Sequence, residues 1–583
     1  MWRPSVPLLL LLILAASGGR GQVAGEAVTV FSAPSQVDVV GELQFLNSHI
    51  TDTPIWTIRD SDGKMTPIAS GFQPPPKDDY GRAIVPGAVV VLPCYIDPSG
   101  VCNPIPELKM TIISDTSSTI MANTAPIYRR LLVIILDYSA CNYPASLQPA
   151  DVRRVWLGPD DDGRGGMAQM FTQCSYGKFN LNITAFRAIT VRGSCTTGAI
   201  EQCSWYDNSV IGDNGAKEQL GKDVFSTFTH FAYIMPPRMR SRCYWAGLAL
   251  LPGKQIWLQT DYTNIYQSGV IMQETIHNYG LWHSWRNGRE YEDYTTPMGR
   301  GNVCLSASES SYMGWSSAAE GGDAIDSSIL TQPGATLSFV LPATYITGDG
   351  NYLRVKPNWL SNYGNASAAK NLYIAVRVNK GGDLRLDPWD ANRVHVHEVN
   401  AILDNDVSGA TRYAYRKISI IGLVTPLSRF DLTDYKLSVY GGSWVKIDTL
   451  RVHLCRYEVT PQECPPLYTL EVVPSPSPPP PSPPPLPSPP SPKPPPSPRP
   501  PPNPRPPPKP PVPRHAPNPP SPETRSMPPP PSPSSPPRSP PKPPSPRAVC
   551  KSAQASKHAY NYEAGGAHGK HYLEQLFIYL AYY

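Results

Sequence analysis

The stretch QETIHNYGLWH, residues 273–283, decides how the rest of the chain is interpreted. Residues 270–280 are predicted to form a helix. Positions i and i+4 of a helix share one face, so Gln273 and His277 can present their side chains to one metal ion. Glu274 lies one residue further on, where its carboxylate can take a proton from a water molecule bound to that metal. The stretch therefore predicts a hydrolytic metal site.

The end of this stretch supplies the remaining parts of the site. Gly280 suits the point at which the chain leaves the helix, because glycine adopts left-handed backbone conformations at little cost. His283 follows this turn and is predicted to be the third ligand. The spacing is that of the zinc-peptidase pattern H-E-x-x-H-x-x-G-x-x-H, except that glutamine occupies the first position.

The glutamine at position 273 is expected to weaken the site without abolishing it. An amide oxygen is a neutral and weaker donor than an imidazole nitrogen, so the metal affinity should fall while the geometry survives. Glu274, whose loss would abolish water activation, is retained. Zinc is the expected metal for two imidazoles in this frame. Copper(II) stays open as an alternative, because it binds such ligands more tightly on the general affinity order.

A methionine downstream supports the same interpretation. Met298 lies in the turn-like segment DYTTPMGRG, residues 293–301, where peptidases of the metzincin type place a methionine beneath the metal. Some metzincins have a metal-facing tyrosine two residues beyond that methionine. Here the position is Arg300, so no such role is assigned to it.

Six segments of the chain resemble the gametolysin-like metallopeptidases of green algae. They are RRLLVIILDYSAC (129–141), CSYGKFN (174–180), WAGLALLPG (245–253), QETIHNYGLWH (273–283), DYTTPMG (293–299) and MGWSS (313–317). The resemblance covers about residues 129–400. It implies a secreted metalloendopeptidase that cuts proline- or hydroxyproline-rich glycoproteins of the cell wall or extracellular matrix, with a removable N-terminal region. The alternative, from another class, is a catalytically inactive structural or binding glycoprotein of the matrix that keeps the peptidase fold.

The N-terminus and the cysteines indicate secretion. Residues 1–21 combine Arg3, an apolar run and small residues, as in a cleaved signal peptide, and no later stretch has the roughly 20 apolar residues of a membrane helix. The eleven cysteines are expected to form disulfides within regions, each of which but the last holds an even number. A local Cys94–Cys102 disulfide is favoured over a latency thiolate on the metal. Cys550 is left over and is expected to pair with a partner chain.

The net charge of +5 resides in a proline-rich tail. Residues 474–546 hold 43 prolines in 73 positions and a net charge of +7, which leaves −2 for the remainder. The remainder has neither the basic character nor the basic-aromatic motif of a nucleic-acid-binding protein. The tail is expected to adopt polyproline II, a rod of up to about 230 Å at ~3.1 Å per residue. Its serine-proline repeats favour a wall-associated role over a passive linker.

The hydrophobic pattern predicts an α+β fold. A metzincin-like catalytic domain, with a twisted sheet and an active-site helix, should precede a β-rich domain and a disordered polyproline tail. Expected elements are strands at 129–138, 178–184 and 230–234, helical segments within 151–171 broken by GRGG, a helix at 216–227, a strand or hairpin at 247–260, and alternating strands from about 337. The expected divisions are a signal peptide (1–21), pro-region (22–128), catalytic domain (129–330), β-rich domain (331–473), proline-rich segment (474–547) and C-terminal tail (548–583).

The other candidate sites receive simpler interpretations. His395 and His397 alternate along a predicted strand and share one face, which favours a packed or solvated strand face over a second metal site. Asn182 and Asn365 begin N-glycosylation sequons. The dibasic pair at 129–130 is a candidate site for removal of the pro-region.

Overall fold

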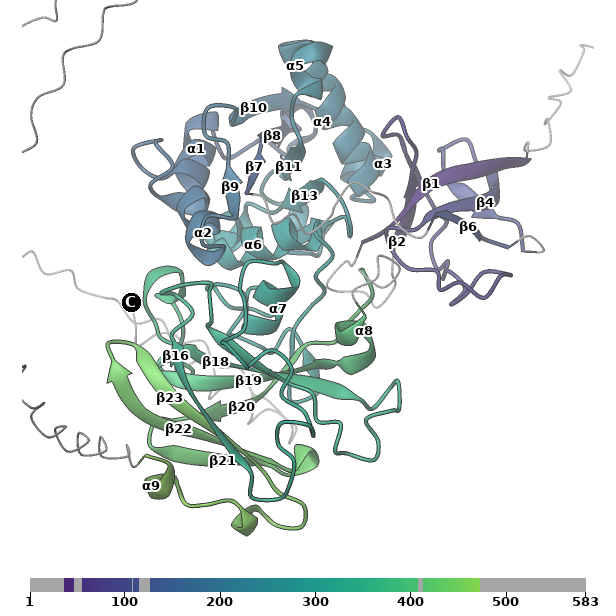
Figure 1. The fold of residues 1–583 in the computed structure, drawn as a ribbon. Coiled ribbons are helices and arrows are strands. Elements are labelled where there is room, and N and C mark those ends of the chain that lie inside the picture. The colour runs from purple at the N-terminus through teal and green to yellow at the C-terminus, as the bar shows by residue number, and fades with distance from the viewer. Residues whose placement is uncertain (1–35, 47–54, 107–108, 115–125, 407–412, 472–583) are drawn as a thin grey trace, which may run out of the picture. The chain divides into compact units, whose positions relative to one another are not determined.

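The computed structural model describes residues 36–46, 55–106, 109–114, 126–406 and 413–471 (Figure 1). Within them the chain is mixed α+β and rich in strands, which confirms the predicted class. The predictions for the signal peptide, the polyproline segment, the C-terminal tail and Cys550 concern residues outside these ranges. No helix among the described residues is long and apolar enough to cross a membrane.

The helices are mostly short. The α-helices are α1 (Pro149–Leu157), α2 (Gly166–Cys174), α3 (Thr197–Ile200), α4 (Trp205–Leu220), α5 (Lys222–Ser226), α6 (Ser268–His277), α7 (Ala307–Tyr312), α8 (Ala401–Asn405) and α9 (Leu467–Leu470). Single 3-10 turns are η1 (Ser139–Cys141), η2 (Met239–Ser241), η3 (Asp261–Tyr266), η4 (Gly381–Asp383), η6 (Thr433–Tyr435) and η7 (Pro461–Glu463). The glycines of GRGG separate α1 from α2, as the sequence predicted.

The sheet beside the motif helix has five strands in the order β10-β8-β11-β13-β12. They are β8 (Leu131–Asp137), β10 (Arg187–Arg192), β11 (His230–Ile234), β12 (Gly247–Ala249) and β13 (Gln255–Leu258). The pairs β8–β10, β8–β11 and β11–β13 are parallel, whereas the edge strand β12 runs antiparallel to β13. The predictions of strands at 129–138 and 230–234 and of a hairpin at 247–260 are confirmed.

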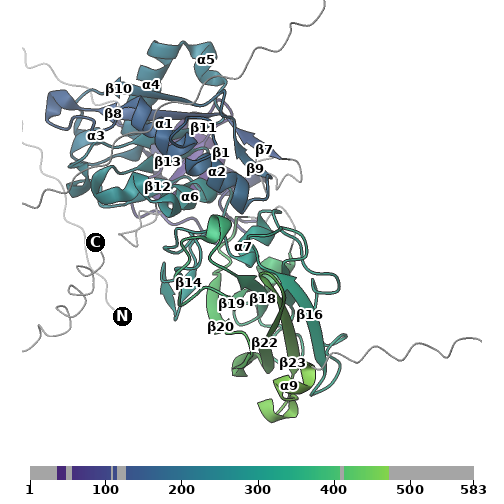
Figure 2. The ribbon, with the colours of Figure 1, turned by 90° about the vertical axis from the view of Figure 1, so that its left-hand side faces the viewer.

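The interior strand β8 explains why helices cover both faces of this sheet. Alternate residues of a strand point to opposite faces. Leu131 and Val133 join the core that includes residues of α1, α2 and α6, whereas Leu132 and Ile134 join a second core with residues of α4. A sheet buried on both faces needs a continuous apolar run such as LLVIIL. Figures 1 and 2 show α1 and α2 on the side of the sheet opposite α4.

A separate antiparallel sheet is formed by the upstream residues. Its strands are β1 (Gln36–Leu46), β2 (Ile55–Arg59), β3 (Met65–Pro67), β4 (Val89–Ile96), β5 (Cys102–Pro104) and β6 (Thr111–Ser114), in the order β3-β2-β1-β4-β5 with β6 on β4. The end of β1 contacts the motif region. Phe45 and Leu251 exchange backbone hydrogen bonds of 2.9 and 2.8 Å, and the Phe45 ring lies 4.6 Å from that of Trp282, centroid to centroid.

Two sheets pack face to face in the downstream region. One has the order β15-β14-β20-β19-β18-β17 and the other β16-β23-β22-β21. Their strands are β14 (Trp285–Arg286), β15 (Arg289–Glu290), β16 (Thr336–Pro342), β17 (Tyr352–Val355), β18 (Lys370–Arg377), β19 (Arg393–Asn400), β20 (Ser419–Val424), β21 (Ser428–Leu432), β22 (Leu437–Lys446) and β23 (Thr449–Arg456). Apolar side chains of both sheets form one core.

A separate two-stranded parallel sheet pairs β7 (Ile127–Arg129) with β9 (Phe179–Leu181).

Among the described residues, five disulfides pair the ten cysteines from Cys94 to Cys464. They join Cys94 to Cys102, Cys141 to Cys195, Cys174 to Cys304, Cys203 to Cys243, and Cys455 to Cys464. The predicted pairing within regions is confirmed. Because Cys94 and Cys102 are bonded to each other, neither supplies a thiolate to a metal.

Candidate metal centre

The helix α6 brings the first three motif residues together in a buried place. Its side chains Ile271, Met272 and Ile276 belong to the core, while Gln273, Glu274 and His277 are 8, 1 and 5% exposed. The predicted helix at 270–280 is confirmed, although it begins at Ser268 and ends at His277.

Position 280, three residues after the end of the motif helix, requires glycine for two physical reasons. Its φ of +95° lies in the region that side chains rarely adopt. A Cβ atom at this position would also lie 2.1 Å from the ring of Tyr413. Nearby, the buried Asn278 donates to the carbonyls of Leu250 and Gln255 at 2.8 and 3.1 Å, which fixes the helix end against the β12–β13 hairpin.

The two histidines face each other through their Nε2 atoms, which lie 3.1 Å apart. The Nδ1 atoms point away. That of His277 lies 2.7 Å from the carbonyl oxygen of Leu281, and that of His283 lies 2.9 Å from Oε1 of Glu290. Both partners accept hydrogen bonds, so each Nδ1 carries a proton, and in a neutral imidazole this tautomer is the one that leaves the Nε2 lone pair for a metal.

This arrangement fits two ligands of one zinc ion. Zinc–nitrogen bonds of ~2.0–2.1 Å in a tetrahedral site place two nitrogens roughly 3.3 Å apart, close to the observed 3.1 Å. Among the described residues no three His, Cys, Asp or Glu side chains converge on a point. Gln273, whose side chain ends in an amide, lies on the same helix one turn before His277.

Gln273 is oriented by the turn that contains Met298. Its Nε2 donates to the carbonyl oxygen of Gly299 at 3.1 Å, which leaves its own carbonyl oxygen as the atom able to bind a metal. Met298 is fully buried and packs in the same core as α6. Its carbonyl accepts from the backbone N–H of Ser284 at 2.8 Å, so the turn also contacts the residue after His283.

The Glu274 carboxylate packs against Gly247, a residue that no sequence pattern singled out. Gly247 lies on the edge strand β12, and a Cβ atom there would lie 2.4 Å from Oε1 of Glu274. Any other residue at 247 would displace the carboxylate. Arg300, by contrast, is exposed and forms an ion pair of 3.6 Å with Glu292.

Residues after His283 complete its surroundings and were missed from sequence. The Tyr291 ring centroid lies 4.2 Å from that of His283. Burial and the charges of Glu290 and Glu274 raise the pKa of Tyr291, so its phenol stays protonated. The sequence signal for these residues is the dipeptide Asn287-Gly288, because Asn-Gly between extended segments is a strong indicator of a β-hairpin. Both residues adopt the positive φ that such a turn requires.

The histidine pair on strand β19 hydrogen-bonds to neighbouring aspartates. His395 and His397 are buried on one strand face, where they hydrogen-bond to the Asp390 carbonyl at 2.6 Å and to the Asp293 carboxylate at 3.2 Å, respectively. Burial alone would raise the pKa of Asp293, but its hydrogen bonds, led by that of His397, bring it to about 2. The interpretation as a packed strand face is confirmed.

Both sequon asparagines share one local geometry. The Asn182 side-chain oxygen accepts from the hydroxyl of Thr184 at 2.9 Å, and that of Asn365 accepts from the hydroxyl of Ser367 at 2.9 Å. Asn365 is exposed and Asn182 half-buried. Glycosylation of either residue stays a prediction.

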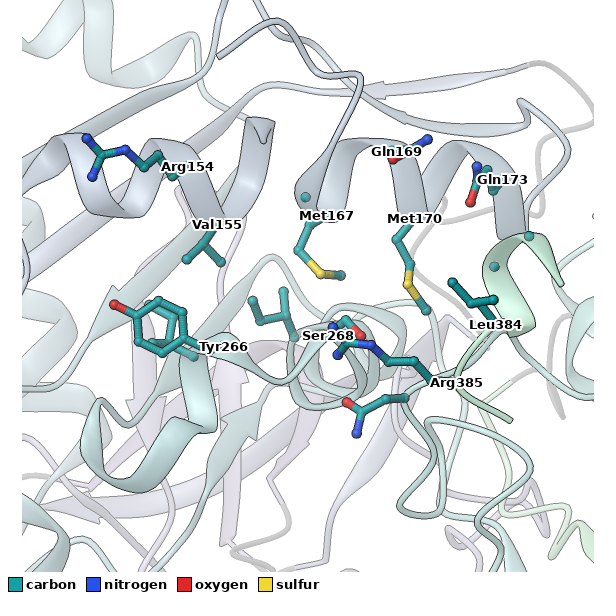
Figure 3. Close-up of a pocket in the computed structure, with 16 residues that line it drawn as sticks. Arg154, Val155, Met167, Gln169, Met170, Gln173, Tyr266, Ser268, Leu384 and Arg385 are labelled. Carbon is teal, nitrogen blue, oxygen red and sulfur yellow. The ribbon is translucent and has the colours of Figure 1, made fainter. Parts of the chain in front are cut away.

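A cavity of about 350 Å³ lies near the start of α6 rather than at the motif. Figure 3 shows Met167 and Met170 of α2 pointing into it, with Tyr266 and Arg385 at its sides. Its lining includes Ile271 but none of the four polar motif residues. The cavity is therefore distinct from the candidate metal centre.

Known proteins share sequence with this region. A sequence model of the gametolysin peptidase M11 family matches residues 130–434, more than half of the 583 residues. Autolysin of Chlamydomonas reinhardtii is 25% identical over 257 aligned residues, an alignment that covers 33% of this chain and 40% of autolysin. The chain thus spans about two fifths of that relative's length.

Proposed function

The chain belongs to the gametolysin peptidase M11 family, which indicates a metallopeptidase, and from this we propose that it is a secreted metalloendopeptidase. The proposed substrates are proline- or hydroxyproline-rich glycoproteins of the cell wall or extracellular matrix. One observation carries the proposal: two imidazoles whose Nε2 atoms lie 3.1 Å apart, each with its Nδ1 hydrogen-bonded, on the same motif as the buried Glu274.

The roles of the residues follow from their chemistry. His277, His283 and the amide oxygen of Gln273 would hold zinc, the metal expected for two imidazoles in this frame. When bound, zinc would supply Lewis-acid polarisation of the scissile carbonyl. Glu274 would take the proton of the attacking water and then deliver it to the leaving amine. Its burial keeps bulk water away from the carboxylate, which strengthens these interactions.

A metzincin-like catalytic domain is the architecture we propose for this chemistry. The support is a mostly parallel sheet with one antiparallel edge strand, β12, next to the motif helix. Met298 lies in a tight turn that hydrogen-bonds to both Gln273 and Ser284. An edge strand offers unpaired backbone groups with which an extended peptide could pair.

The upstream sheet is proposed to act as a pro-region. Phe45 pairs with Leu251, two residues beyond the edge strand β12. Its ring also packs against Trp282, the residue directly before His283. The dibasic pair is a poor cleavage site in the folded chain, since Arg129 is 1% exposed and ends β7. Removal of the region would therefore require cleavage elsewhere or local opening.

The test of the proposed function is digestion of a proline-rich wall glycoprotein. The full chain and a chain lacking residues 22–128 would be assayed with and without a chelator, and their metal content measured. We expect chelator-sensitive cleavage that increases when the upstream region is removed. Metal binding without any cleavage would support the alternative, a non-catalytic matrix glycoprotein, which the glutamine at position 273 favours.

Replacing Gln273 with histidine is expected to tighten zinc binding by more than about tenfold, or about 1.4 kcal/mol. The reason is that a third imidazole is a stronger donor than an amide oxygen. Zinc affinity would be measured by competition with a chromophoric chelator. The matched control is Gln169→His, which adds an imidazole at an exposed position of α2. Unchanged affinity in Gln273→His would show that residue 273 is not a ligand.

The tail is proposed to tether the protein in the matrix. Its serine-proline repeats resemble wall components in composition, and Cys550 lies just beyond them. A disulfide-linked species on a non-reducing gel should disappear in Cys550→Ser if this cysteine links the chain to a partner.

A further inference from the structure

A chain of hydrogen bonds reaches His283 from a distant part of the sequence. Nδ1 of His283 donates to Oε1 of Glu290 at 2.9 Å. The same carboxylate oxygen accepts from the hydroxyl of Tyr415 at 3.2 Å, and the indole N–H of Trp285 donates to that hydroxyl. Each donor polarises the next, so the chain acts as one unit.

The two histidines differ in this respect. His277 donates its Nδ1 proton to the neutral carbonyl of Leu281, whereas His283 donates to a carboxylate. A carboxylate acceptor draws the Nδ1 proton more strongly and thereby raises the electron density at Nε2, the atom that would bind the metal. His283 is consequently the stronger of the two donors.

We propose that Glu290, supported by Tyr415, is a positioning residue that compensates for the weak ligand Gln273. In the proposed metal site, on which this inference rests, one of three donors is a neutral amide. The Glu290 carboxylate offsets that loss in two ways. It fixes the His283 ring with Nε2 directed at the Nε2 of His277, and it makes the His283 imidazole a stronger donor.

The local backbone is built to hold Glu290 in this place. Trp285–Arg286 and Arg289–Glu290 form a tight hairpin through Asn287-Gly288, and β14 of this hairpin pairs with β20 of the downstream sheet. Tyr415 lies four residues before β20, so both members of the support are placed by the same sheet. Trp282 packs on the Tyr415 ring at a centroid distance of 5.0 Å, which limits its movement.

The test is a double-mutant cycle on zinc affinity, measured by chelator competition without any peptide substrate. Glu290→Gln is expected to weaken zinc binding about 10- to 100-fold, the usual cost of removing such a partner. In the Gln273→His background the same change should cost several-fold less, because three imidazoles no longer depend on one strengthened donor. Tyr415→Phe should weaken binding in the same direction by a smaller factor.

The matched control is Glu292→Gln, which removes a nearby carboxylate paired with Arg300 and should leave zinc affinity within about twofold, below the 10- to 100-fold range. Equal affinity of Glu290→Gln and the parent would overturn the inference. An equal cost in both backgrounds would overturn the compensation. If Glu290→Gln does not fold, Tyr415→Phe decides, since it removes only a hydroxyl. A protein whose zinc affinity depends on Glu290 but which cuts no peptide would refute the proposed function and leave this inference standing.

Discussion

Replacing Glu274 with glutamine is expected to lower kcat/KM on a peptide substrate by roughly 10²- to 10⁴-fold, the usual contribution of a general base. The side chain keeps its shape, so it still fits against Gly247. The proposed metal ligands are untouched, and zinc content should equal that of the parent. Only the ability to accept a proton from water is lost. Initial rates and metal content measured on the same preparations check the prediction.

A second substitution separates the position of the carboxylate from its presence. Glu274→Asp keeps the charge but withdraws it by one methylene, so its rate should lie between those of the parent and Glu274→Gln. Turnover of Glu274→Gln equal to that of the parent would refute the role of Glu274 as base. Loss of zinc in Glu274→Gln would instead mean that the residue supports the ligands.

The local parts of the site were predictable from sequence because they depend on short-range geometry. The spacing of Gln273, Glu274 and His277 fixes their places on one helix, and glycine is required at position 280 wherever the helix must end in the left-handed region. The run at residues 131–136 likewise predicted a buried strand, since a strand covered on both faces buries consecutive apolar residues.

The parts that depend on long-range pairing were not predictable. Glu290 was unremarkable in sequence because its partner Tyr415 is 125 residues away. The hairpin that carries it joins the downstream sheet by pairing β14 with β20, although residues 285–290 were assigned to the catalytic region. No local pattern of hydrophobic residues specifies such a pairing.

One helix was misplaced for a local reason. The prediction of a helix at 216–227 was wrong in its bounds, because α4 spans Trp205–Leu220 and a separate turn, α5, follows. Ser204 caps α4 by accepting from the N–H of Asp207 at 3.1 Å, and Gly221 ends it with a φ of +83°. Ser204 followed three residues later by an acidic residue was a start signal that the hydrophobic pattern alone did not show.

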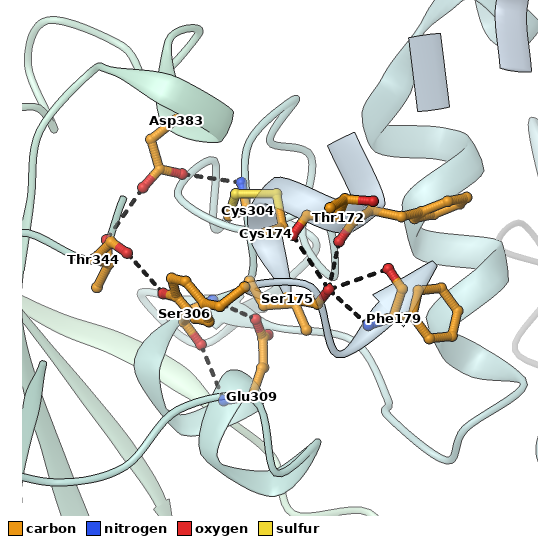
Figure 4. Close-up of a disulfide and its surroundings, with 12 residues drawn as sticks. Thr172, Cys174, Ser175, Phe179, Cys304, Ser306, Glu309, Thr344 and Asp383 are labelled. Atoms are coloured by element: carbon orange, nitrogen blue, oxygen red, sulfur yellow. Dashed lines mark hydrogen bonds between the residues drawn. A yellow bond between two sulfur atoms is a disulfide. The ribbon is translucent and has the colours of Figure 1, made fainter. Parts of the chain in front are cut away.

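Replacing Asp383 with asparagine is expected to lower the free energy of unfolding by about 3–5 kcal/mol, because it leaves a buried guanidinium without its counter-charge. Asp383 and Arg377 are each 1% exposed and form two hydrogen bonds, of 2.5 and 2.8 Å. Asp383 also accepts from the backbone N–H of Cys304 at 3.0 Å, beside the Cys174–Cys304 disulfide (Figure 4). Urea-induced unfolding of parent and variant measures the effect.

The control for this prediction is the same substitution at an exposed ion pair. Asp79 forms a 2.6 Å pair with Lys109, and both side chains are more than half exposed. Asp79→Asn should not change the unfolding midpoint. Solvent screens the attraction between exposed charges, and fixing two mobile side chains in one geometry costs conformational entropy. Equal midpoints for Asp383→Asn and the parent would mean that the buried pair contributes nothing to stability.

A double variant distinguishes the orphaned charge from the contacts that the arginine makes. Arg377 donates to the carbonyls of Thr295 and Cys304 at 3.1 Å each, and to that of Leu305 at 3.4 Å. Arg377→Met combined with Asp383→Leu removes both charges, so the desolvation cost disappears with the ion pair. The double variant should therefore be more stable than Asp383→Asn and still less stable than the parent, because three carbonyls lose this donor and two of these hydrogen bonds are buried. Thr295 lies three residues before Met298. We therefore expect the remaining loss in free energy of unfolding of the double variant to be accompanied by weaker zinc binding. A double variant as stable as the parent, with unchanged zinc affinity, would show that Arg377 does not hold this turn in place.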